Sequence, residues 1–125
     1  MEKEIKGEYM KKTYTEKIEQ ANQEMGAYAK NSPQMMTAFM GLHHIASEDG
    51  ALLAKHKELI ALGISIHTKC EGCIVSHIHD ALKVGATHDE IIETINVAIY
   101  MGGGPCVIYG SKAFAALQEF EKANK

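Results

Sequence analysis

Apolar side chains recur at intervals of three and four residues along almost the whole chain, and apolar–polar alternation never continues beyond a few positions. The first pattern places side chains on one face of an α-helix, whereas alternation is typical of a strand. The sequence therefore predicts an all-α fold of five to six helices. In the first helix, at about residues 14–30, one face is expected to carry Ile18, Ala21, Met25 and Tyr28.

Start and stop signals divide the rest of the chain. Ser32 and Pro33 suit an N-cap and a first helical residue, and Asp49–Gly50 ends that second helix. The remaining helices are expected at about residues 51–67, from Cys70 to about Val84, from the Thr87–Glu90 capping box to Gly102, and from Pro105 to about Phe120. Residues 1–13 are predicted to be a charged lead-in, and residues 14–125 a single helical domain.

Two helices show the clearest candidates for core positions. The third is expected to turn Leu52, Leu59, Ile60 and Ile64 toward the core. The fifth helix is expected to bury a stripe of apolar side chains, which consists of Ile91, Ile95, Ala98 and Ile99. Because the chain is small and its apolar faces are extensive, we expect several chains to associate and so complete the hydrophobic core.

Composition and net charge argue against several classes of protein. With 125 residues the chain has room for one domain, and a net charge of −3 argues against a nucleic-acid partner. All 13 basic residues are lysine, so the bidentate clamp that arginine provides for carboxylate or phosphate is absent. No apolar run is long enough to span a membrane, and residues 1–12 do not resemble a signal peptide. We therefore expect a cytoplasmic protein, in which the three cysteines serve catalysis, redox chemistry or metal binding rather than structural disulfides.

The segment from Cys70 to His77 carries the strongest chemical signal. Cys70, Cys73 and His77 fall within roughly 60° of one another on a helix. Thiols at the start of a helix face unpaired N–H groups and the positive end of the helix dipole, which favour a thiolate. This arrangement indicates a redox pair, although two cysteines and a histidine are also zinc ligands, with Glu58, Cys106 or another histidine as the fourth.

Other residues provide weaker signals. Glu58 precedes Cys70 by twelve positions, so its helix could pack against the cysteine helix and pass protons through His77. His79 should point away from that face. His67 could line the site but is more typical of a core or surface position. Cys106 is expected to be buried, and core packing is expected for Tyr100 and Tyr109. The remaining candidates are expected on solvated surfaces: His43, His44 and His56.

Together these residues resemble a known family. Glu58, Cys70, Cys73 and His77 match the E-x11-C-x2-C-x3-H signature of the AhpD-like alkylhydroperoxidases, in the carboxymuconolactone decarboxylase family. The similarity covers about residues 33–117. It implies a helical bundle, a protomer of an intertwined trimer or hexamer, and peroxide reduction without a metal or organic cofactor.

The resemblance also implies roles for the site residues. Cys73 would attack the peroxide, Cys70 would resolve the sulfenic acid and exchange with a dithiol reductant or partner redox protein, and Glu58 with His77 would relay protons. Gly72 departs from the pattern, because peroxidase members often carry histidine there.

Three alternatives remain. The first is a reductase of small-molecule or protein disulfides, in which a more exposed Cys70 is the nucleophile. The second is a lactone decarboxylase, which fits an arginine-free chain poorly, and the third is a zinc-binding module.

Overall fold

The computed structural model describes residues 12–124, and within that range it contains six helices and no strand. The predicted lead-in falls almost entirely on residues outside this range. The helices are α2 (Tyr14–Asn31), α3 (Pro33–Ser47), α4 (Ala54–His67), α5 (Glu71–Lys83), α6 (His88–Gly102) and α7 (Gly104–Ala123). The all-α prediction is confirmed.

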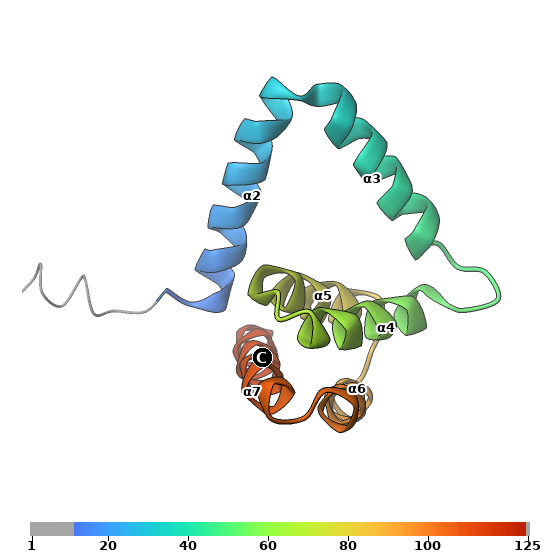
Figure 1. Cartoon of the computed structure of the whole chain (residues 1–125), viewed down its shortest axis with the longest axis vertical. Helices are drawn as coiled ribbons and strands as arrows, with labels where there is room; N and C mark the ends of the chain where they lie inside the picture. Colours follow the sequence, from blue (N-terminus) through green and yellow to red (C-terminus); the bar gives the residue numbers. More distant parts are fainter. Residues whose placement is uncertain (1–11, 125) are drawn as a thin grey trace, which may run out of the picture.

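Helices α4 to α7 pack together and hold the core, whereas α2 and α3 form an open V that extends from it (Figure 1). Neither α2 nor α3 contains a buried residue. The start of α2, at the open end of the V, is attached to α7, because the Glu119 carboxylate accepts hydrogen bonds from the backbone N–H groups of Tyr14 and Thr15 at 2.9 and 3.2 Å. The fully buried side chains with the largest volume are Leu62, Ile66, Ile74, Ile78, Ile91, Leu117, Val75 and Cys106.

Several predicted boundaries are confirmed. Thr87 and Glu90 form the capping box of α6, and Gly85 adopts a positive φ of 94° after α5. Ser32 is the N-cap residue of α3, although its side chain makes no capping hydrogen bond. Helix α4 begins at Ala54 rather than near residue 51, and Leu53 is its N-cap residue.

The predicted core face of α4 is wrong. Leu52 lies before the helix and is exposed, Ile60 and Ile64 are also exposed, and Leu59 is only partly buried. The buried side of α4 instead carries Leu62, Ser65 and Ile66, together with Glu58. Because this side of α4 is the buried one, the Glu58 side chain points toward α5. On α6 the predicted stripe is correct, with Ile99 partly buried at its edge.

Candidate active site

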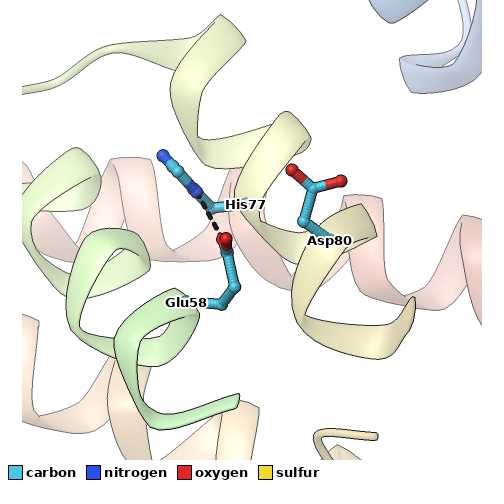
Figure 2. A group of neighbouring side chains, drawn as sticks. All are labelled: Glu58, His77 and Asp80. Atoms are coloured by element: carbon cyan, nitrogen blue, oxygen red, sulfur yellow. Dashed lines mark hydrogen bonds and ion pairs between the residues drawn. The ribbon is translucent and has the colours of Figure 1, made fainter. Parts of the chain in front are cut away.

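The site begins with a carboxylate buried between two helices. Glu58 lies on the face of α4 that packs against α5, and its side chain is 8% exposed. A carboxylate taken out of water needs a partner that replaces the lost hydration. His77 of α5 provides it, because His77 Nδ1 lies 2.7 Å from Glu58 Oε2. With an ionised carboxylate the hydrogen is on Nδ1, and the outer ring nitrogen points away from Glu58 (Figure 2).

Cys70 and Cys73 lie at the first turn of α5. Cys70 is the N-cap residue, with extended backbone, and its sulfur accepts a hydrogen bond from the Cys73 N–H at 3.3 Å. The two Cα atoms are 5.3 Å apart and the sulfur atoms lie within bonding distance of each other. Cys73 is exposed and Cys70 only partly so, which corrects the expectation that Cys70 is the more accessible thiol. His77 follows Cys73 by one turn on the same face.

Asp80 is a site residue that the sequence reasoning missed. Each of Glu58, His77 and Asp80 offers one polar atom, and these three atoms lie within 4.8 Å of one another. Figure 2 shows the Asp80 carboxylate beside the pair. The available signal was its spacing, because Asp80 follows His77 by three residues on one helix.

These three residues also form a group that could hold a cation, and neither cysteine belongs to it. The alternative of a zinc site would need Cys70, Cys73 and His77 around one ion. In the part of the chain that the structure describes, the two sulfurs instead approach each other and His77 contacts Glu58.

Glu71, the first of the two residues between the cysteines, makes a second ionic contact. Glu71 Oε1 lies 2.6 Å from Lys17 Nζ of α2, and its other oxygen lies 3.8 Å from Lys112 Nζ of α7. The hydrogen bond from Lys17 lowers the pKa of the Glu71 carboxyl, and Lys112 adds to this effect. The same hydrogen bond raises the pKa of Lys17.

The weaker candidates lie elsewhere. His67 lines an apolar groove of about 460 Å³ between α4 and α6. Cys106 is buried as predicted, with its sulfur 4.0 Å from the Ile66 carbonyl oxygen.

The two tyrosines differ in their burial. Tyr100 is 84% exposed, so the prediction that it packs in the core is wrong. Tyr109 is partly buried against the core. His79 is exposed and contacts Asp80 and Phe120, and the predicted surface histidines are confirmed as exposed: His43, His44 and His56.

The model of the carboxymuconolactone decarboxylase family matches residues 33–119. The chain belongs to this family. The predicted relationship and the all-helical fold are therefore confirmed.

Relatives with curated sequences do not identify an activity. An uncharacterised protein of Cupriavidus necator is 37% identical over 99 residues, which cover 79% of this chain and 88% of the relative. A protein of the Paracoccus denitrificans cox locus, also uncharacterised, is 34% identical over 103 residues, or 82% of this chain and 93% of the relative.

Solved structures of the carboxymuconolactone decarboxylase family share the fold. A family protein from Legionella pneumophila, crystallised in its apo form, superimposes with a TM-score of 0.83 at 37% identity, covering 86% of this chain and 96% of that one. A family protein from Thermotoga maritima gives a TM-score of 0.78 at 26% identity, covering 86% and 92%. A part in the antioxidative response has been suggested for the Thermotoga protein. Among the described residues of the present chain, no helix combines the length and apolar character of a membrane span.

Proposed function

We propose that this family member is a thiol–disulfide oxidoreductase that reduces hydroperoxides through Cys70 and Cys73. The observation that carries the proposal is the 2.7 Å contact between Glu58 and His77, one turn beyond a close pair of sulfurs. A buried carboxylate that orients an imidazole is the standard support for a general acid–base group. The antioxidative role suggested for the Thermotoga relative agrees with this assignment.

In the first half-reaction Cys73 is the nucleophile, because it is the more exposed thiol. Its proton passes to the outer nitrogen of His77, while Glu58 holds the ring and stabilises the imidazolium. The Cys73 thiolate then attacks a peroxide oxygen, so that an S–O bond forms and the O–O bond breaks. The sulfur is oxidised to a sulfenic acid, and the leaving alkoxide takes the proton back from His77.

In the second half-reaction Cys70 attacks the Cys73 sulfur. The S–S bond forms while the S–O bond of the sulfenic acid breaks, and the leaving hydroxide takes the proton of the Cys70 thiol to become water. An external dithiol or partner redox protein then reduces the disulfide by thiol–disulfide exchange. None of these steps uses a metal or an organic cofactor.

A disulfide reductase is the second candidate. The hydrogen bond from the Cys73 N–H to the Cys70 sulfur favours a thiolate at Cys70, which could attack a small-molecule or protein disulfide directly. Gly72 supports this reading because it provides no imidazole between the cysteines.

The experiment measures hydroperoxide consumption and disulfide reduction side by side, with a dithiol as electron donor. We expect Cys73→Ser to abolish peroxide consumption, while Cys106→Ala, the buried thiol outside the pair, retains it. Mass analysis after peroxide treatment should show a Cys70–Cys73 disulfide that the dithiol reverses. Disulfide turnover without peroxide turnover would favour the second candidate, and the absence of a reversible disulfide would contradict both.

We propose in addition that the chain works as a homo-oligomer, a trimer or hexamer, in the reducing cytoplasm. The exposed apolar side chains of α2 and α3 support the assembly, because a monomer would leave them in water. The absence of nucleic-acid and membrane partners stays a prediction from charge and composition.

A further inference from the structure

Two carboxylates meet one imidazole between α4 and α5. Each of Glu58, His77 and Asp80, the carboxylate–histidine group, offers one ligand atom, and these atoms lie within 4.8 Å of one another. Glu58 comes from α4, while His77 and Asp80 are three residues apart on α5 and share a face of that helix. Figure 2 shows how the three side chains converge. Two ligands spaced i, i+3 on one helix, with a carboxylate from a facing helix, are an arrangement that holds metal ions in helical bundles.

The negative charge of this group is not balanced by lysine. In the described part of the chain, the ion pairs of lysine go to Glu71 and Glu90, and none goes to Glu58 or Asp80. Asp80 contacts His79 at 3.3 Å, but the His79 side chain is 53% exposed to solvent. The imidazole of His77 carries at most one positive charge against the two carboxylates. A divalent cation would neutralise both of them.

The donor atoms and their exposure suit a transition-metal ion. Imidazole nitrogen and carboxylate oxygen both bind zinc, which in open sites takes three protein ligands and a water molecule. Glu58 is almost buried, whereas the Asp80 side chain is 37% exposed, so an ion can enter from the side of Asp80. Ligand atoms around zinc are about 3.3 Å apart. His77 Nδ1 and Glu58 Oε2, now 2.7 Å apart, would therefore separate slightly, and Asp80 would rotate inward.

We propose that the carboxylate–histidine group binds a divalent transition-metal cation, and that the bound ion inhibits the cysteine pair. The inhibition rests on the proposed function, whereas the binding does not. An ion on Nδ1 of His77, the nitrogen that faces Glu58, places the single N–H of the neutral ring on the outer nitrogen. The outer nitrogen then cannot accept the proton of Cys73. Peroxide reduction therefore belongs to the ion-free protein.

Zinc binding to the oxidised full chain tests the site. The disulfide is formed with diamide, so that neither Cys70 nor Cys73 is a thiolate ligand. Isothermal titration calorimetry in a buffer that does not bind zinc measures the Kd. We expect Asp80→Asn and Glu58→Gln each to raise the Kd by at least about 10-fold, because loss of a residue that merely orients a ligand already costs that much.

Two variants outside the group are the controls. Asp89→Asn makes the same change at an exposed position of α6, and His79→Ala removes the other histidine beside Asp80. Both should keep the wild-type Kd. Loss of binding in His79→Ala with wild-type affinity in Glu58→Gln would place the ion on the exposed His79–Asp80 pair and overturn the proposal. The same Kd in the wild type and all four variants, or no zinc binding by the wild type, would also overturn it.

Manganese tests the inhibition on the reduced chain, because thiolates select softer ions such as zinc. One addition of hydroperoxide starts the reaction without a dithiol, and mass spectrometry follows formation of the Cys70–Cys73 disulfide. We expect a saturating concentration of Mn²⁺ to slow the wild type by about 10-fold or more, because a positioned base contributes about 100-fold or more. Asp80→Asn, compared with its own rate without the ion, should be slowed much less. An unchanged wild-type rate, or equal slowing of both proteins, would overturn inhibition through this group.

The cation site and the proposed function fail separately. A chain that binds zinc at this group but forms no reversible disulfide with peroxide would overturn the proposed function and leave the cation site standing. A chain that consumes peroxide and binds no zinc would overturn the cation site alone.

Discussion

A buried carboxylate marks the site at the scale of single residues. Glu58 and Ser65 are the two buried polar residues in the described part of the chain. Ser65 donates its hydroxyl hydrogen to the Ala61 carbonyl within its own helix, so its burial needs no other partner. Glu58 instead depends on His77 from the neighbouring helix. A polar contact of this kind positions an imidazole more precisely than packing of apolar side chains would.

Removal of either member of the pair tests its role in proton transfer. We expect His77→Ala to lower kcat/KM for a hydroperoxide by about 100-fold or more, which is the usual contribution of a positioned acid–base group. Glu58→Gln keeps the size of the side chain but loses its charge, and should lower kcat/KM by about 10-fold to 100-fold. Steady-state peroxide consumption with excess dithiol measures both.

His79→Ala is the matched control, because His79 lies two residues further on α5 with an exposed side chain. It should retain wild-type kcat/KM. Equal losses in His77→Ala and His79→Ala, or wild-type activity in Glu58→Gln, would contradict a relay through the Glu58–His77 pair. Unfolding curves of each variant identify any loss that comes from a damaged fold.

The sequence predicted the residues of the family signature, but it could not predict which lysines approach Glu71. Helical spacing and the family signature placed His77 in phase with Cys73, and the prediction that Glu58 reaches across to His77 is confirmed by their contact. Asp80 was within reach of the same spacing argument. Lys17 and Lys112 were not, because their approach to Glu71 depends on how α2 and α7 pack against α5.

At the scale of helices, boundaries were easier to predict than buried faces. Gly85 and the Thr87–Glu90 box end and begin helices by local chemistry, which the sequence displays directly. Helix α4 is apolar on two sides, so periodicity could not tell which side faces the core. The core takes the side of Leu62, and Ile60 and Ile64 on the other side line the groove between α4 and α6.

The turn between α6 and α7 requires a glycine at position 102, because no side chain fits there. A Cβ atom added to Gly102 would overlap the sulfur of Cys106 and lie 3.2 Å from a ring carbon of His67. Cys106 cannot retreat freely, because it is buried against the end of α4. We expect Gly102→Ala to lower the free energy of unfolding by about 1–3 kcal/mol, measured by chemical denaturation.

The same substitution at Gly26 is the control. Gly26 lies inside α2 with nothing within 4 Å of an added Cβ, so Gly26→Ala should raise helix stability by up to about 1 kcal/mol. Cys106→Ala should recover part of the loss in Gly102→Ala, because it removes the overlapping sulfur. A wild-type denaturation midpoint for Gly102→Ala would contradict the predicted overlap.

At the scale of the whole molecule, large apolar side chains are exposed on two surfaces of the described residues. Figure 1 shows α3 standing away from the α4–α7 core. Its exposed large apolar residues include Met35, Phe39, Met40, Leu42 and Ile45. The groove between α4 and α6 adds Ile60, Ile64, Val97 and Met101. In the proposed assembly, copies of the chain would bury the exposed apolar residues of α3 and this groove in each other, which removes both from water.

Charges placed on these two surfaces test the assembly. Phe39→Glu on α3 and Ile64→Glu in the groove each replace an apolar side chain whose burial is worth about 1.5–3 kcal/mol and add a charge that is costly to bury. We expect the wild type to sediment as three or six chains and both variants to shift toward single chains, with the shift measured by analytical ultracentrifugation across protein concentration. Gln34→Glu adds the same charge at an exposed polar position on α3 and should assemble as the wild type does. A wild type that sediments as a single chain at micromolar concentration would contradict the assembly, and two variants that assemble fully would show that it uses other surfaces.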